Sequence, residues 1–230
     1  DFVGDPACFD EKLLLLPSDG QPYRPSAIPV EITLPERLDT DEVAIAIAAT
    51  TMKLNPRFLQ ACQQITQLTQ SQYGKRVRFH FLIGQAQGLL YPQLQRLIRR
   101  YLPDALMYPH QPYPQYLSAF SRCDLFLSPF PFGNTNGIID ALTVGLPGVC
   151  KTGAEVFEHI DEGLLRRAGL PEWLIADSIE RYIKAAARLA GDFRIRQRLY
   201  SYLEDGQPLQ RLFEGRDELL GNRLLELLGR

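Results

Sequence analysis

The sequence predicts an α/β fold built on a doubly wound parallel sheet. Short apolar runs alternate along the chain with segments of helix length, as expected of strands that alternate with helices. The run over 43–49 is almost continuously apolar, which is typical of a strand covered on both faces. Residues 123–153 contain an apolar run, a polar loop, a helical segment and a second apolar run, which together predict one βαβ unit.

The remaining elements follow from the same periodicities. Asn55 and Pro56 are typical of a helix cap and a first helical residue, and Gly145 and Pro147 end the helix of the βαβ unit. The expected strands cover 29–34, 43–49, 76–84, 106–108, 125–127, 148–150 and 174–176. The expected helices cover 56–70, 89–102, 113–122, 138–144, 155–168, 177–189, 193–203 and 209–228.

Residues 1–28 are rich in Pro, Gly and Asp, with one apolar burst over 13–16. We expect them to form a lead-in that wraps over a surface, followed by one domain over 29–230. The 230 residues are 45% hydrophobic and 23% charged, which suits a compact protein with a substantial core. The first residues have neither an initiator Met nor the pattern of a signal peptide, so we expect a fragment or a trimmed chain.

Charge and cysteine content disfavour several classes of function. The net charge of −2 argues against non-specific nucleic-acid binding, and no apolar run approaches the roughly 20 residues of a membrane span. Cys8, Cys62, Cys123 and Cys150 show no C-x-x-C spacing, so neither a zinc site nor a redox pair is expected. A reducing cytoplasm is the expected location. A Rossmann dehydrogenase is disfavoured because no G-x-G-x-x-G follows an expected strand.

The loop from Gly133 to Gly137 lies where the helix of the βαβ unit begins. Free N–H groups and the helix dipole make such a turn a suitable site for an anion such as a diphosphate. Thr135 and Asn136 add donors, and Asp140, one turn into the helix, could accept hydrogen bonds from ribose hydroxyls. The alternative is that the residues from Asn134 to Asn136 simply cap the helix.

Several polar residues fall in loops that follow expected strands: Lys53, Gln85, His110 and the stretch from Asn134 to Asn136. In a doubly wound sheet, ligands bind beyond the carboxyl ends of the strands. We therefore expect these residues to converge on one edge of the sheet.

Three stretches carry a resemblance to a known family. P-F-P-F-G-N-T-N-G-I-I-D, G-L-P-G-V-C-K-T-G-A-E-V-F-E-H-I-D-E-G-L and G-L-P-E-W-L-I-A resemble the C-terminal region of the bacterial HMW1C-like protein N-glycosyltransferases, which are related to the O-linked N-acetylglucosamine transferases. The resemblance implies that 29–230 is the Rossmann-like C-terminal half of a GT-B glycosyltransferase that binds a UDP-sugar. It also implies that 1–28 leads in from a missing N-terminal lobe.

The resemblance implies roles for individual residues. Lys53, in T-M-K-L-N-P, resembles a catalytic lysine that contacts phosphate, although a solvated lysine at a helix start is the alternative. His110 resembles a histidine of the nucleotide pocket, although an isolated histidine in such a loop is often structural. Gln85 resembles a glutamine near the sugar, although Gln87 is an equally polar neighbour. The candidate nucleotide-sugar ligands are thus Thr50, Gln85, His110, Asn134, Thr135, Asn136, Gly137 and Asp140, with Thr152 as a further contact.

The predicted function is an inverting transfer of glucose or galactose from a UDP-hexose to asparagine in N-x-S/T, on an acceptor protein held by the missing lobe. Lys53, Thr135, Asn136 and the N–H groups around Gly137 would stabilise the departing diphosphate, so neither a metal nor another cofactor is expected. A Ser/Thr O-GlcNAc-type transferase is the alternative chemistry. A stand-alone nucleotide-sugar-binding module is the alternative of another class, and the isolated chain is expected to bind UDP with or without turnover.

Overall fold

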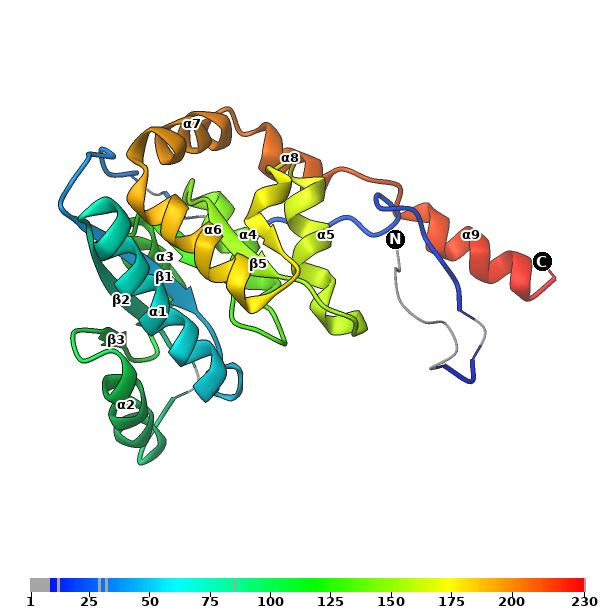
Figure 1. Cartoon of the computed structure of the whole chain (residues 1–230). Coiled ribbons are helices and arrows are strands. Elements are labelled where there is room, and N and C mark those ends of the chain that lie inside the picture. The colour runs from blue at the N-terminus through cyan, green and yellow to red at the C-terminus, as the bar shows by residue number, and fades with distance from the viewer. Residues whose placement is uncertain (1–8, 12, 29, 32, 85, 230) are drawn as a thin grey trace.

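The computed structural model describes residues 9–11, 13–28, 30–31, 33–84 and 86–229. They form a six-stranded sheet in the order β3-β2-β1-β4-β5-β6, and every neighbouring pair of strands is parallel (Figure 1). The strands are β1 Glu42–Ala48, β2 Arg76–Leu82, β3 Leu106–Tyr108, β4 Leu125–Leu127, β5 Gly148–Lys151 and β6 Ile175–Ala176. The predicted doubly wound parallel sheet is confirmed.

Helices cover both faces of this sheet. Helices α1 and α6 pack side by side on one face, and α3 and α4 lie behind the sheet in the view of Figure 1. The helices are α1 Pro56–Tyr73, α2 Leu90–Tyr101, α3 Tyr113–Ser121, α4 Asn136–Thr143, α5 Ile160–Arg167, α6 Ile179–Gly191, α7 Phe193–Glu204, α8 Gln207–Phe213 and α9 Glu218–Leu227. Short 3₁₀ helices cover Thr51–Lys53, Val156–Glu158 and Glu172–Leu174.

The apolar strands supply the core, because a strand with helices on both faces has no side that contacts water. Val43, Ile45, Leu125 and Leu127 are all fully buried. Helix α1 begins as its sequence predicts: the side chain of Asn55 accepts a hydrogen bond from Phe58 N over 3.0 Å. The helix stops at Gly74, whose φ of 69° favours glycine.

Three predicted elements differ from the structure. The strand expected over 29–34 is wrong for the described residues in that range, 30–31 and 33–34, which are irregular. The helix expected over 155–168 divides at His159 into a 3₁₀ turn and α5. The helix expected over 209–228 divides into α8 and α9, and Glu214 at the end of α8 is extended. Apolar periodicity did not reveal either break.

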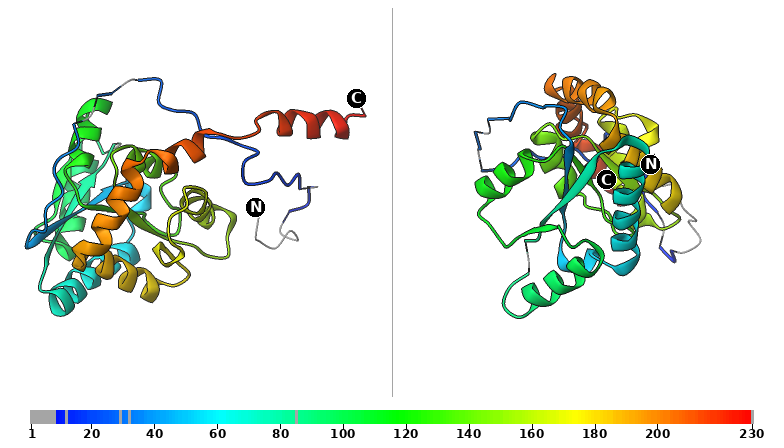
Figure 2. Two further views of the ribbon diagram at one scale, coloured as in Figure 1. Left: turned by 90° about the horizontal axis from the view of Figure 1, so that it is seen from above. Right: turned by 60° about the vertical axis from the view of Figure 1, so that its left-hand side comes forward.

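The described part of the lead-in packs against α5 and α8. Tyr23 N donates to Leu212 O over 2.8 Å, Arg167 donates to Ser18 O over 3.0 Å, and Arg216 binds Asp19 with two 2.7 Å hydrogen bonds. Helix α9 projects away from the body beside this segment and contains no buried residue (Figure 2). The division into a 1–28 lead-in and a 29–230 domain stays a prediction.

Candidate functional site

The strand order reverses between β1 and β4. In open α/β sheets, ligands bind beyond the carboxyl ends of the strands at such a switch point. The loop after β1 carries Lys53, and the loop after β4 leads to the turn from Gly133 to Gly137. The side chain of Asn55 joins the two loops, since its Nδ2 donates to Phe130 O over 2.7 Å and to Lys53 O over 3.3 Å. The structure therefore brings together two segments that are about 80 residues apart in the sequence.

Thr50 and Lys53 bracket the short 3₁₀ turn after β1. Lys53 N donates to Thr50 O over 3.1 Å, and both residues are half-buried. The loop is therefore held by its own backbone and by Asn55, and its lysine lies at the same edge of the sheet as the turn after β4.

Aromatic packing fixes the loop that leads from β4 to the turn. The ring of Phe130 makes edge contacts with Phe58, at 5.5 Å between centroids, and with Tyr182, at 5.2 Å. The Tyr182 hydroxyl donates to Ser128 O over 2.9 Å in the buried core. The loop that leads to the turn is thereby fixed to α1 and α6.

A carboxylate of the protein accepts hydrogen bonds from two of the backbone N–H groups of the turn. Asn134 N donates to Asp161 Oδ2 over 2.7 Å, and Thr135 N donates to Asp161 Oδ1 over 2.9 Å. Ser128 Oγ makes a very short hydrogen bond to the same carboxylate. Asp161 of α5 therefore occupies the backbone N–H groups of Asn134 and Thr135. The anion site at this turn stays a prediction.

The turn has an unusual backbone. Thr135 has φ 51° and ψ −93°, and within the described part of the chain it is the one non-glycine residue with a positive φ. A Cβ on Gly133, whose φ is 64°, would lie 2.5 Å from Asp161 Oδ2, and a Cβ on Gly137 would collide with the side chain of Asn134. Asn134 is buried, and its Nδ2 has no hydrogen-bond partner among the described residues.

Asp140 lies one turn into α4, as predicted, and accepts hydrogen bonds from two tyrosines of α3. Tyr113 Oη donates over 2.7 Å and Tyr116 Oη over 3.1 Å. Burial raises the pKa of Asp140, an effect that these two hydrogen bonds partly offset. Burial, reinforced by the hydrogen bond to Asp140, raises the pKa of Tyr113 to about 12, so this hydroxyl remains a donor at neutral pH.

His110 is exposed and lines a pocket of about 290 Å³ with Tyr113 and Tyr116. The same two tyrosines bind Asp140, so the histidine pocket and the predicted ribose acceptor are neighbours. Asn136, the first residue of α4, is exposed, and its Oδ1 accepts a 3.3 Å hydrogen bond from Tyr23 of the lead-in. Gln85 lies outside the described residues, and the alternative Gln87 is exposed after β2.

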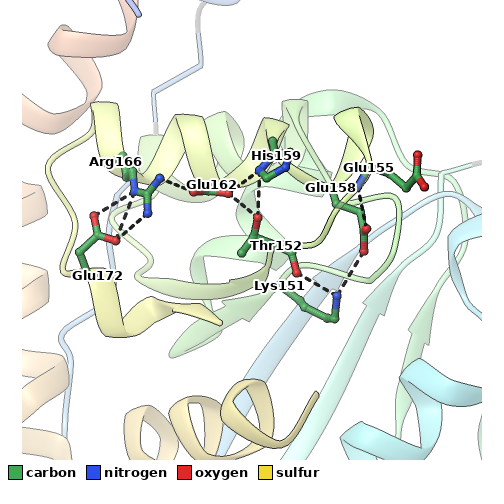
Figure 3. Close-up of polar contacts among 8 residues, drawn as sticks. All are labelled: Lys151, Thr152, Glu155, Glu158, His159, Glu162, Arg166 and Glu172. Atoms are coloured by element: carbon green, nitrogen blue, oxygen red, sulfur yellow. Dashed lines mark hydrogen bonds and ion pairs between the residues drawn. The ribbon is translucent and has the colours of Figure 1, made fainter. Parts of the chain in front are cut away.

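The acidic stretch after β5 forms a linked cluster (Figure 3). Lys151 binds Glu158 over 3.2 Å, and Glu162 binds His159 over 2.8 Å and, with very short hydrogen bonds, Thr152 and Arg166. Thr152, predicted as a further sugar contact, thus uses its hydroxyl within the protein. Thr152 still lies at the carboxyl end of β5, which neighbours β4 in the sheet.

Asp161 and Glu162, which a polar helix face would expose, are instead buried at 1% and 8% exposure. The sequence contains one D-x-D, Asp39-Thr40-Asp41, which precedes β1 at the opposite edge of the sheet. Among the described residues, no group of three or more His, Cys, Asp and Glu could hold a metal ion.

Sequence reasoning missed Asp161, Tyr113, Tyr116 and Tyr23. The spacing of Tyr113 and Tyr116 by three residues at the start of a helix placed them on one face, which was a usable indication. Asp161 gave none, because an acidic residue in the first turn of a helix is common and its partners lie 26 and 27 residues earlier in the chain.

Known proteins resemble this chain over its whole length. The chain is 49% identical over 230 residues, 99% of its length, to a UDP-glucose:protein N-beta-glucosyltransferase of Actinobacillus pleuropneumoniae serotype 7. The chain spans 36% of that relative, about a third of its length. The resemblance stated from the motifs is confirmed. No protein-family model matches the chain.

Solved structures share the fold. A mutant of the O-GlcNAc transferase of Thermobaculum terrenum superposes with a TM-score of 0.68 at 19% identity, covering 92% of this chain and 38% of that one. WaaG, a glycosyltransferase of lipopolysaccharide biosynthesis, superposes with a TM-score of 0.51 at 12% identity, covering 84% of this chain and 48% of that one. These neighbours are GT-B glycosyltransferases, so the predicted Rossmann-like domain is confirmed. None of the described helices is long and apolar enough to span a membrane.

Proposed function

We propose that this chain is the UDP-hexose-binding half of a protein N-glycosyltransferase that inverts the sugar linkage and needs no metal. The observation that carries the proposal is the junction at the switch point, where Asn55 ties the loop of Lys53 to the loop that leads to Thr135. The similarity to a UDP-glucose:protein N-beta-glucosyltransferase supports glucose as the hexose and asparagine as the acceptor. Because the chain spans about a third of that relative, the activity of a whole enzyme is part of the proposal.

UDP would lie along the carboxyl edge of β4 and its neighbours. Its uracil and ribose would occupy the pocket of His110, with Asp140 accepting from a ribose hydroxyl. Each carboxylate oxygen has about two lone pairs, so Asp140 keeps acceptor capacity beyond the bonds from Tyr113 and Tyr116. The diphosphate would lie between Lys53 and the start of α4, and the hexose would point toward Thr152.

Breaking the bond between the sugar and UDP leaves additional negative charge on the diphosphate. A fixed ammonium and a helix N-terminus stabilise such charge without reorganisation at the moment of reaction. Lys53 and the first residues of α4 would supply this stabilisation in place of a metal. The cytoplasm is the proposed location, in keeping with the buried free thiols of Cys62, Cys123 and Cys150.

A Ser/Thr O-GlcNAc-type transferase remains the alternative chemistry, since an O-GlcNAc transferase shares this fold. A nucleotide-sugar-binding module without turnover is the alternative of another class, because the part of the relative that this chain does not match would have to hold the acceptor. Incubating the chain with UDP-glucose, UDP-galactose or UDP-GlcNAc and a peptide that contains N-x-S/T separates these alternatives by the mass added to the peptide.

Titration calorimetry with UDP and with uridine tests the proposed site. We expect Lys53→Ala to weaken UDP binding about tenfold, a loss of about 1.4 kcal/mol, and to leave uridine binding unchanged. Lys184→Ala is the matched control, since Lys184 is exposed on α6 and pairs with Glu180. Equal UDP affinity in Lys53→Ala and the unsubstituted chain, or UDP binding that requires a divalent cation, would contradict the proposal.

A further inference from the structure

Asp161 is almost fully buried, at 1% exposure, and its hydrogen bonds connect three elements. It lies in the first turn of α5, and it accepts from the end of β4 at Ser128 and from the start of α4 at Asn134 and Thr135. A buried charge is costly unless hydrogen bonds satisfy it, and here three donors do so. The donors of the turn therefore stabilise the buried charge of Asp161, and Asp161 in turn fixes the backbone of the turn.

The conformation of Thr135 is the reason to assign Asp161 more than a structural role. A non-glycine residue with a positive φ is strained, and it persists where the surroundings over-determine its conformation. The two peptide groups that precede Thr135 are fixed by what they bind, since Asn134 N and Thr135 N both donate to Asp161. Without the carboxylate, Thr135 would relax and displace the start of α4.

The negative charge of Asp161 would disfavour the binding of an anion at this turn, so its presence there needs a reason. A carboxylate directly behind an anion-binding turn repels the anion, and at effective interior permittivity such a repulsion is substantial. The protein nevertheless buries this carboxylate there. If the turn kept its shape without Asp161, removing the charge would strengthen the binding of a diphosphate.

We infer that Asp161 is a positioning residue, which holds Thr135 in its positive-φ conformation and so shapes the start of α4 to receive the diphosphate of the nucleotide-sugar. The inference rests on the proposed function, because it needs the diphosphate to bind at this turn. Asp161 does not contact the ligand; it acts through the backbone of Asn134 and Thr135.

Titration calorimetry of Asp161→Asn with UDP and with uridine tests this inference. The amide keeps one acceptor oxygen but places an NH₂ group against donors, so the turn loses at least one hydrogen bond. We expect UDP affinity to fall about tenfold while uridine affinity stays within about twofold, since a tenfold change corresponds to about 1.4 kcal/mol. Asp161→Ala is a second variant that removes every acceptor.

Asp124→Asn is the matched control. Asp124 is a half-buried carboxylate that accepts a 2.8 Å hydrogen bond from Ala44 N, but it precedes β4 at the opposite edge of the sheet. Both variants should lower the midpoint of urea unfolding, and Asp124→Asn should leave the ratio of UDP to uridine affinity unchanged. A general loss of stability would therefore appear in both variants, and a loss of positioning in Asp161→Asn alone.

A double-mutant cycle with Thr135→Gly tests the route through the backbone. Glycine adopts a positive φ without strain, so in the Thr135→Gly background Asp161→Asn should weaken UDP binding much less than in the unsubstituted chain. Additive effects of the two substitutions, or UDP binding that is equal or tighter in Asp161→Asn, would overturn the inference and leave the proposed function intact. If the unsubstituted chain has no UDP affinity, both proposals fail.

Discussion

The hydroxyl of Tyr113 donates a 2.7 Å hydrogen bond to Oδ1 of Asp140, and this contact joins the first residue of α3 to the middle of α4. It orients the carboxylate that we assign to the ribose. It also connects the pocket of His110 to the turn at the start of α4, because Tyr113 lines that pocket. The hydroxyls of Tyr113 and Tyr116 thus link the two parts of the proposed nucleotide site.

Tyr113→Phe should weaken UDP binding about threefold to tenfold, since Asp140 loses the shorter of the two hydrogen bonds that orient it. Pyrophosphate binding should not change, because we propose that the diphosphate binds at the start of α4, away from Asp140. Tyr202→Phe is the control, as it removes a hydroxyl that donates to Ala168 O over 2.9 Å away from the site. Calorimetry that finds equal losses for UDP and pyrophosphate would contradict the assignment of Asp140 to the ribose.

Asn55→Ala should lower the free energy of unfolding by about 2 kcal/mol. It removes both the cap of α1 at Phe58 N and the hydrogen bond to Phe130 O. Ser178→Ala removes a cap alone, at Arg181 N of α6, and should cost about 1 kcal/mol. Urea unfolding measures both; equal losses in the two variants would mean that the bond between the loops adds nothing to stability.

Gly137→Ala should destabilise the chain by about 1–3 kcal/mol and weaken UDP binding. Its Cβ would collide with the buried side chain of Asn134, which cannot move without disturbing the turn. Gly163→Ala is the contrasting variant: no atom lies within 4 Å of a Cβ built on this glycine of α5, so the variant should gain about 0.5–1 kcal/mol. If Gly137→Ala left both the melting temperature and the UDP affinity unchanged, the turn would have more room around Gly137 than the contact with Asn134 indicates.

Glu162 should make the stability of the folded chain depend on pH in the acid range. Burial by itself raises its pKa, but hydrogen bonds from Thr152 and His159 and the charge of Arg166 outweigh burial, so the pKa lies below the usual 4.5. A depressed carboxylate pKa means that its stabilising contribution is complete above the unfolded-state pKa and is lost as pH falls through the folded-state pKa.

The comparison is between the unsubstituted chain and Glu162→Gln. The difference in melting temperature should be largest above about pH 5 and should shrink below about pH 4, because protonation then removes the advantage of the carboxylate. A difference that stays constant from neutral to acid pH would show that the ionised form of Glu162 contributes no stability.

The sequence determined the six strands of the sheet and its parallel doubly wound class, although it also predicted a strand over 29–34 whose described residues are irregular. An apolar run such as the one around Ile45 is typical of a strand that is buried between two layers of helices. Asn55, Pro56 and Gly74 mark helix ends through short-range hydrogen bonding and backbone geometry, so the bounds of α1 were predictable within a few residues. The polar loops after β1 and β4 were located for the same reason.

Only the tertiary structure decided what those loops contact. The breaks at His159 and after α8 depend on packing that apolar periodicity does not record. The capture of the Asn134 and Thr135 N–H groups by Asp161 depends on the angle at which α5 approaches the sheet. Local sequence sets which backbone groups a turn leaves free. The completed fold decides which side chain comes within hydrogen-bonding distance of each free group and so becomes its partner.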